Sequence, residues 1–352
     1  MNIRKLFLSS IISISLVQAI AQVPVVHTYN FLNLPISARV TSLGGNLIST
    51  KDNDLNAAIV NPALLSDTMN NNVTLSYINY FADINYGYAA FAKKLKNKQN
   101  ISAGIQYLNY GNFVRADETG ATSGSFTANE MSLNLSYARP IIDSNITVGG
   151  TLKTIYSGLD SYTSLGSAID LGIIYNRPKQ NFAVAAVIKN AGYQWKPYLK
   201  DNREKLPFDM QIGFSKRPKH VPFRYSVTYQ HLEKWDLTAH DPNNSFVTID
   251  PLTGLPVGGS KVTLFGDKLM RHFVLGGEFS LTKNFFLRVG YNYQRRKELK
   301  VPEKRGMTGF SFGFGFKIYK FNISYGHAVY SLAGASNNFS ISFDVNSFYS
   351  KK

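Results

Sequence analysis

The feature that most limits the fold of this chain is a period-two alternation of apolar and polar residues, which runs from residue 73 almost to the C-terminus. Residues 310–317 read Phe-Ser-Phe-Gly-Phe-Gly-Phe-Lys, and residues 131–137 and 339–345 alternate in the same way. Successive side chains of a β-strand point to opposite faces, so the pattern predicts strands with one apolar and one polar face. Because this spacing dominates over helical spacing, the sequence indicates an all-β fold.

The alternating segments predict fourteen strands, most of them longer than the roughly 5–6 residues of a typical strand and close to the roughly 9–11 residues that a tilted strand needs to cross a bilayer. The connections between them alternate between short and long, as in outer-membrane barrels, whereas a soluble sandwich has no reason to sort its loops. We therefore expect an all-β membrane protein, a 14-stranded antiparallel transmembrane β-barrel over residues 73–346 with a C-terminal tail at 347–352. An even strand count places both termini on the periplasmic side. The predicted strands lie near 73–80, 84–94, 99–110, 127–139, 145–157, 165–176, 180–190, 207–216, 221–232, 269–281, 284–295, 306–317, 319–330 and 336–346.

The composition agrees with strands that face lipid. Charged residues make up 17% of the 352 residues, below the roughly 25% of soluble domains, and aromatic residues make up 13%. The few charges inside the predicted strands, such as Lys153, Arg224, Glu278 and Arg288, belong in a polar lumen. The chain has no cysteine, which excludes disulfides, thiolate catalysis and thiolate metal sites.

Residues 1–21 have the pattern of a secretory signal peptide. Arg4 and Lys5 precede an apolar run, and Ala19-Ile20-Ala21 provides a small-residue cleavage site. The alternative is a lone transmembrane anchor, but the run contains several serines and falls short of the roughly 20 residues that an anchor requires. Export followed by barrel insertion predicts an outer-membrane location.

Residues 22–72 do not alternate and read as a loop with short helical pieces. Their mixed apolar and polar content indicates a folded segment, since a disordered tail would be richer in charge. A plug inside the barrel lumen and a periplasmic tail are both compatible with this content, and we favour the plug. The segment carries three short motifs: Ser37-Ala38-Arg39, Leu43-Gly44-Gly45 and Asn61-Pro62-Ala63.

These three motifs, with an acidic spacer before the last one, resemble the N-terminal signature of the PorV/PorQ group of outer-membrane proteins, and residues 29–39 and 325–342 are most similar to its PorQ branch. That group is itself similar to the FadL-type transporters of hydrophobic compounds, whose strand number agrees with the count above. The resemblance covers both ends of the chain, and the middle strands carry no specific motif. One departure is the end of the chain, where Ser350, Lys351 and Lys352 follow the aromatic pair Phe348-Tyr349.

The resemblance implies a non-enzymatic component of the type IX protein secretion system. Such a component anchors a PorZ-like surface protein near the complex that attaches cargo to lipopolysaccharide. Its partners would be that surface protein, other type IX components, lipopolysaccharide and outer-membrane lipid, and not nucleic acid. The alternative is a FadL-like transporter of hydrophobic compounds, in which the plug moves and the ligand leaves through an opening in the wall.

Two regions are candidate contact sites. The long connection over residues 233–268 contains Trp235, Phe246 and Phe265, which are either binding anchors for a partner or residues that pack the loop onto itself. A basic cluster near residue 300 predicts contacts with anionic lipopolysaccharide or an acidic partner. Its simpler interpretation is the anchoring of the barrel end at the polar interface. The cluster residues are Arg295, Arg296, Lys297 and Arg305.

The sequence contains no complete motif for catalysis or metal binding. Gly309-Phe310-Ser311-Phe312-Gly313 has the letters of a nucleophile elbow, but it lies inside an alternating strand instead of a strand–turn–helix. Residues 52–63 begin like a calcium loop but lack its glycine and its terminal glutamate. No histidine pair has metal-ligand spacing, and no phosphate-binding glycine loop is present. We predict a protein that is not an enzyme and that carries no cofactor and no metal.

Overall fold

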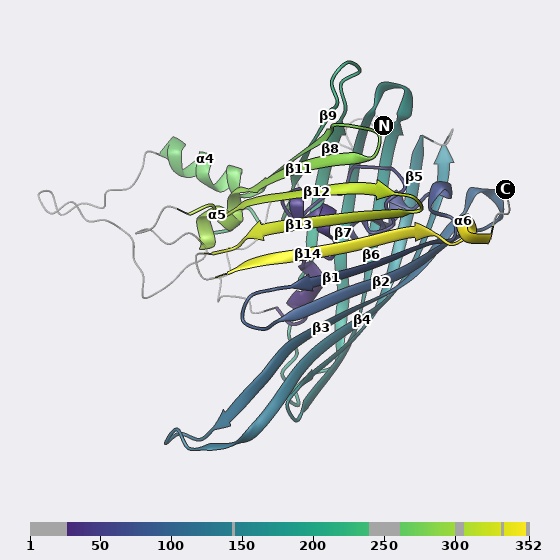
Figure 1. Cartoon of the computed structure of the whole chain (residues 1–352). Helices are drawn as coiled ribbons and strands as arrows, with labels where there is room; N and C mark the ends of the chain where they lie inside the picture. Colours follow the sequence, from purple (N-terminus) through teal and green to yellow (C-terminus); the bar gives the residue numbers. More distant parts are fainter. Residues whose placement is uncertain (1–26, 143–144, 239–260, 300–305, 332–333, 350–352) are drawn as a thin grey trace, which may run out of the picture.

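The computed structural model describes residues 27–142, 145–238, 261–299, 306–331 and 334–349, so the predicted signal peptide at 1–21 lies outside the described residues. Fourteen antiparallel strands close into a barrel in this part of the chain (Figure 1). Each strand pairs with its neighbours in the sequence, and β1 closes the ring against β14. The predicted 14-strand barrel is confirmed. The strands are β1 (Asn72–Asn79), β2 (Asn85–Lys94), β3 (Asn100–Ala116), β4 (Thr122–Ile142), β5 (Ile146–Leu159), β6 (Tyr162–Arg177), β7 (Phe182–Lys196), β8 (Asp209–Lys216), β9 (Phe223–Tyr229), β10 (Phe273–Ser280), β11 (Phe285–Asn292), β12 (Phe310–Ile318), β13 (Phe321–Val329) and β14 (Ala335–Asp344).

None of the helices in the described ranges has the length and apolar character that crossing a membrane requires.

The alternation of the sequence becomes an inside and an outside face. In β1, Thr74 and Ile78 are buried, whereas Leu75 and Tyr77 between them are 46% and 54% exposed. Large apolar side chains are exposed in the same way on other strands, for example Leu133, Leu135, Leu152, Leu171 and Ile212. So much contiguous apolar surface is unfavourable in water and is what a lipid-facing barrel wall requires.

The strands differ from the predicted ranges mainly at their ends. β3 and β4 continue as a long hairpin that leaves only residues 117–121 between them, and β5 and β6 are separated only by residues 160–161. The predicted long connections over 111–126 and 158–164 are therefore wrong, because these polar residues keep pairing beyond the barrel wall (Figure 1). The connections between β7 and β8 and between β9 and β10 lie at the same end as this hairpin, which we call the loop end. The opposite end is the turn end.

Three helices replace strand or coil that the sequence predicts. Residues 269–271, predicted as strand, end helix α4 (Lys261–Arg271), where Asp267 and Arg271 form an i,i+4 ion pair. Residues 293–295, also predicted as strand, begin helix α5 (Tyr293–Leu299), whose run of Gln, Arg, Lys and Glu favours a helix. The predicted tail at 347–352 overlaps α6 (Asn346–Tyr349).

The N-terminal segment (residues 27–71) lies inside the barrel (Figure 1). Helix α2 (Ala38–Ser42) contacts β11 to β14, and the 3₁₀ turn η2 (Pro62–Leu64) contacts β4 to β6 on the far wall. The short helix α3 (Ala57–Val60) lies between them in the sequence. The segment forms a hydrophobic core with inward residues of β2, since Val40, Leu47 and Leu55 cluster with Tyr88 and Ala90. The N-terminal segment therefore occupies part of the barrel interior and contacts both walls.

Candidate functional site

Helix α2 is fixed against the wall formed by β13 and β14. Ser37 accepts a hydrogen bond from the Val40 N–H at 3.3 Å and caps the helix. The Ala38 N–H donates to Ser340 Oγ on β14 at 2.9 Å. The carbonyl oxygen of Ala38 lies only 2.2 Å from the point where a Cβ at Gly326 would stand. The helix backbone thus approaches the strand so closely that only glycine fits at position 326.

The Leu43-Gly44-Gly45 motif ends α2. Gly44 and Gly45 have φ angles of +94° and +95°, in the left-handed region that side chains disfavour. The Gly44 N–H donates to Ser311 Oγ on β12 at 3.1 Å, and the backbone of Leu43 and Gly44 packs against Gly290 on β11. Ser311 belongs to the elbow-like motif of the sequence, and here its hydroxyl supports a turn.

The Asn61-Pro62-Ala63 motif contacts the opposite wall. Asn61 Oδ1 accepts a hydrogen bond from the Ala63 N–H at 3.0 Å, and Asn61 Nδ2 donates to the Ile48 carbonyl at 2.9 Å. The backbone of Pro62 and Ala63 lies within 2.5–2.7 Å of the position for a Cβ at Gly149 on β5. All nine residues of the three motifs are therefore placed in contacts within the segment or with the barrel wall.

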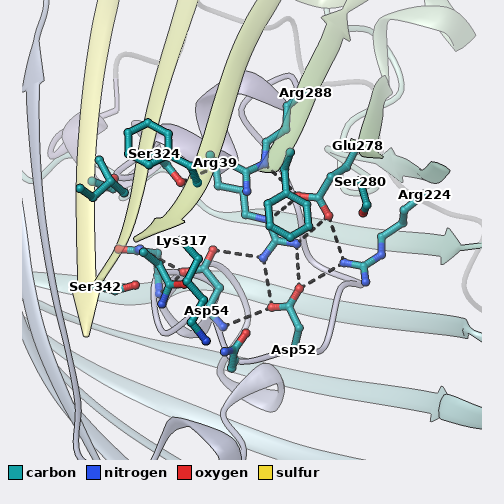
Figure 2. A pocket seen from close by; sticks show the side chains of 18 of the residues that line it. Arg39, Asp52, Asp54, Arg224, Glu278, Ser280, Arg288, Lys317, Ser324 and Ser342 are labelled. Carbon is teal, nitrogen blue, oxygen red and sulfur yellow. Dashed lines mark hydrogen bonds and ion pairs between the residues drawn. The ribbon is translucent and has the colours of Figure 1, made fainter. Parts of the chain in front are cut away.

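Arg39 is the centre of a buried network of charges (Figure 2). Its guanidinium binds Asp52 through two hydrogen bonds of 3.0 and 2.7 Å, and Glu278 on β10 through two of 3.0 and 3.1 Å. It also donates to Asp54 at 3.2 Å. Paired hydrogen bonds between a planar guanidinium and a carboxylate are among the strongest polar contacts in proteins. Arg39 therefore joins helix α2 and the loop that contains Asp52 and Asp54 to the barrel wall.

Two further arginines complete the network from the wall. Arg288 on β11 donates to Glu278 at 2.9 Å, and Arg224 on β9 donates to both Asp52 and Glu278 at 3.1 and 3.3 Å. The strand register places these three side chains next to one another, because Glu278 on β10 is directly opposite Arg224 on β9 and Arg288 on β11. Three arginines thus meet three carboxylates, which balances the charge at a site where an unpaired ion would be costly.

The positive charges of the network lower the pKa of Asp52. Burial by itself raises the pKa of a carboxyl group, but the charges of Arg39 and Arg224 and the hydrogen bonds from Arg39 outweigh burial and hold the pKa of Asp52 well below its usual value. Asp52 is therefore charged throughout the physiological pH range.

The network borders a cavity of about 260 Å³ that faces the turn end. Two more cations line this cavity, Arg217 and Lys317, so five cationic side chains face three acidic ones. A second cavity of about 240 Å³ lies towards the loop end, and its lining includes Gly45, Asn46, Arg295 and Tyr330. The N-terminal segment lines both cavities and lies between them.

The candidate partner residues are only partly described. Trp235 and Phe265 are 46% and 56% exposed, and their rings lie 5.3 Å apart between centroids. Phe265 lies on helix α4 instead of in a loop, and Trp235 also stacks on His272 at 5.8 Å. Phe246 lies outside the described residues. The pair is thus both self-packed and accessible, which agrees with either interpretation of the loop.

The basic cluster is less available than the sequence indicates. The Arg295 guanidinium lies 4.2 Å from the centre of the Tyr330 ring and lines the loop-end cavity. Arg296 donates to the carbonyls of Gly306 and Thr308, and Lys297 forms an ion pair with Asp267 at 2.6 Å. Arg305 lies outside the described residues. Binding of an anionic surface by this cluster stays a prediction, for which Lys297 is the most exposed of the described members.

The sequence placed Arg224, Glu278 and Arg288 in the lumen but did not join them to Arg39, Asp52 and Asp54. The available signal was the presence of isolated charges at inward positions of otherwise uncharged strands. Such charges require partners of opposite sign. The N-terminal segment contains acidic residues that could serve as these partners, but they are far from β9 to β11 in the sequence.

No model of a protein family matches this chain, and no curated protein sequence is similar to it. Solved structures do match. The toluene transporter TodX of Pseudomonas putida is 12% identical, with a TM-score of 0.52 over 88% of this chain and 96% of that chain. A TodX deltaS2S3 mutant, described as a monoaromatic hydrocarbon channel, is 12% identical, with a TM-score of 0.51 over 87% and 98%. A FadL homologue of Pseudomonas aeruginosa is 10% identical, with a TM-score of 0.49 over 88% and 98%.

At these identities the comparisons establish the fold and not the activity. The chain has a closed 14-strand barrel and shares its fold with the toluene transporter TodX. The barrel fold that the sequence predicts is thus confirmed, and the finer assignment to the PorQ branch of the PorV/PorQ group is not supported by these comparisons. None of these three structures is described as a type IX secretion component.

Proposed function

We propose that this chain is an outer-membrane transporter of small hydrophobic compounds, with its N-terminal segment acting as a plug in the lumen. The observation that carries the proposal is the arrangement of one internal segment between two cavities in a closed barrel. The fold of TodX, which transports toluene, supports the same substrate class. In this proposal the turn end, which carries the C-terminal helix α6, faces the periplasm, whereas the described chain begins at the loop end, where His27 pairs with Lys205 of the β7–β8 connection.

Transport through this barrel requires the plug to move. Leu43, Leu47, Ile48, Leu55 and Ile59 are all buried in one apolar cluster, so at rest they seal the interior. A displaced plug would expose these same side chains as an apolar route. The glycine contacts on both walls and the Arg39 network oppose such a displacement, which makes the bound plug the resting state.

The test uses a plug that can be locked. The Cβ of Ser49 lies 3.4 Å from the position for a Cβ at Gly213 on β8, close to the roughly 3.5–4.5 Å of a disulfide. Ile48 Cγ1 lies 2.5 Å from the same position, so the Ile48 side chain has to shift to admit the cysteine, and the single variant Gly213→Cys measures the effect of that shift. The chain has no cysteine, so the double variant Ser49→Cys/Gly213→Cys would contain one cysteine pair only. We expect cells that express the wild-type chain to take up labelled toluene faster than cells without it. Cells with the oxidised double variant should lose at least 80% of that gain.

The two single-cysteine variants are the matched controls, and uptake by the double variant should return when the disulfide is reduced. Uptake that is unaffected by locking would contradict a moving plug. Uptake of toluene and of a labelled long-chain fatty acid that equals the rate of cells without the protein would contradict hydrophobic transport altogether.

A second candidate function is the secretion scaffold implied by the N-terminal signature. The tight attachment of the plug favours this candidate, since a scaffold needs a rigid barrel and no transport route. A scaffold should co-purify with a large surface protein from the native outer membrane, and its deletion should impair protein secretion. The locked double variant should then restore secretion fully, whereas a transporter would remain inactive when locked.

A further inference from the structure

Three side chains that commonly bind metals converge where β8 begins and β9 ends. Asp209 is the first residue of β8, and His231 and Glu233 follow β9 at the loop end. One ligand atom from each lies within 4.8 Å of the other two. His231 Nδ1 is 3.3 Å from Asp209 Oδ1 and 3.2 Å from Glu233 Oε1. Two ligand atoms bound to one tetrahedral zinc ion, each at about 2.0–2.2 Å, are separated by about 3.4 Å.

The backbone fixes these side chains in place. His231 adopts a left-handed conformation with φ of 57°, and its N–H donates to Asp209 Oδ1 at 2.9 Å. The Met210 N–H donates to the second oxygen of Glu233 at 3.0 Å, which leaves Oε1 directed at His231. Hydrogen bonds that orient ligands from behind are typical of metal sites, because they hold the ligands in the binding geometry before the ion arrives.

The local charge suits a divalent cation. With His231 as a metal ligand, and therefore neutral, Asp209 and Glu233 supply two negative charges, and Lys189 is the strand-register partner of Asp209 on β7. The net charge of these four groups is −1. One nitrogen and two carboxylate oxygens are a donor set that zinc and other divalent transition metals accept.

A buried amide beside the cluster provides an independent observation. Gln211 donates from Nε2 to Asp209 Oδ2, and its side chain is 1% exposed. Its Oε1 atom is buried without a hydrogen-bond partner, although Gln211 lines the same loop-end cavity as Asp209 and His231. A buried acceptor of this kind calls for a donor. A water molecule on a bound metal ion would supply one.

We propose that Asp209, His231 and Glu233 bind one divalent transition-metal ion at the rim of the loop-end cavity. The ion would join the first residue of β8 to the chain that leads from β9 towards helix α4. It would therefore stiffen the rim of the barrel. Asp209 and His231 line the loop-end cavity, but none of the three ligands belongs to the N-terminal segment or to the Arg39 network, so the site can be tested separately from transport.

The test uses Zn²⁺ alone and the full barrel in detergent. Isothermal titration should give one tight site per chain, and Co²⁺ in its place should give the intense visible absorption of a tetrahedral ion. The variants His231→Ala and Glu233→Gln should each weaken Zn²⁺ binding at least tenfold. Glu233→Gln retains an oxygen that accepts from the Met210 N–H, so this variant should fold normally.

His220→Ala is the matched control, because His220 lies at the turn end of the same β8–β9 hairpin. This variant should bind Zn²⁺ as the wild type does. The proposal is overturned if the wild type shows no tight site. It is equally overturned if His231→Ala and Glu233→Gln bind Zn²⁺ as tightly as the wild type, since the cluster is then an ion pair between a protonated histidine and two carboxylates.

Discussion

Arg39 Nε donates a hydrogen bond of 3.0 Å to Glu278 Oε2, and the two residues are 239 positions apart in the sequence. This bond connects the N-terminal segment to strand β10. Glu278 is 5% exposed and Arg39 is 8% exposed, so both side chains are buried. Removal of one of them would leave the other as a buried ion that has lost a partner.

Arg39→Ala should therefore destabilise the folded barrel strongly. Removal of one member of a buried ion pair costs about 3–5 kcal/mol, and here three carboxylates lose a partner together. Urea unfolding of the refolded barrel in detergent, followed by tryptophan fluorescence, would measure the loss. Arg115→Ala is the control, because Arg115 pairs with Asp160 at an exposed site where an ion pair is worth about 0–1 kcal/mol. Equal losses for the two variants would show that the network contributes little.

Acid should weaken the same network. The folded-state pKa of Asp52 lies below that of the unfolded chain, about 3.9. A group with a lowered folded pKa contributes stability that is fully present above its unfolded pKa and is lost as the pH falls towards its folded pKa. We expect the urea midpoint to fall as the pH is lowered from 5 to 2. Asp52→Asn should lower the midpoint at pH 7 and flatten this dependence; an unchanged pH slope in the variant would assign the acid sensitivity to other groups.

The close approach of the N-terminal segment to the barrel wall predicts a contrast between two adjacent glycines of β5. A Cβ at Gly149 would stand 2.5 Å from the Pro62 carbonyl carbon, whereas a Cβ at Gly150 would meet nothing closer than 3.6 Å. Gly149→Ala should cost about 1–3 kcal/mol through overpacking, and the N-terminal segment should become more sensitive to protease. Gly150→Ala should leave both properties near those of the wild type. Limited proteolysis with mass spectrometry would identify the cleaved segment, and equal behaviour of the two variants would contradict the packing argument.

The barrel could be predicted from the sequence because a membrane imposes one simple rule on each strand. Leu75 and Tyr77 must face lipid while Thr74 and Ser76 face inward, and this rule repeats at every strand whatever the neighbours are. The ends of the strands follow no such rule. Beyond the wall, β3 and β4 continue to pair, for example Asn112 with Thr127 and Ala116 with Thr122, although these residues do not alternate as the membrane-facing strands do.

The charged site could be predicted only in parts. Alternation placed Glu278 and Arg288 on the inward face, but their pairing depends on the register of β10 and β11, which the sequence analysis did not predict. The position of Arg39 opposite them depends on how the N-terminal segment crosses the barrel. That path is determined by contacts between residues far apart in the sequence, such as Ala38 with Gly326 and Asn61 with Gly172, for which no local pattern exists.

Trp235 and Phe265 provide the last prediction, which concerns a partner at the loop end. Exposed aromatic side chains that already pack against each other are preordered, so a partner that covers them pays little entropy and gains a large apolar contact. If a surface protein docks there, Trp235→Ala/Phe265→Ala should reduce its co-purification with the barrel at least tenfold. Trp195→Ala is the matched control, because Trp195 is also exposed, at 64%, and lies on β7 away from helix α4. Equal retention of the partner by the double variant and the control would place the docking surface elsewhere on the barrel.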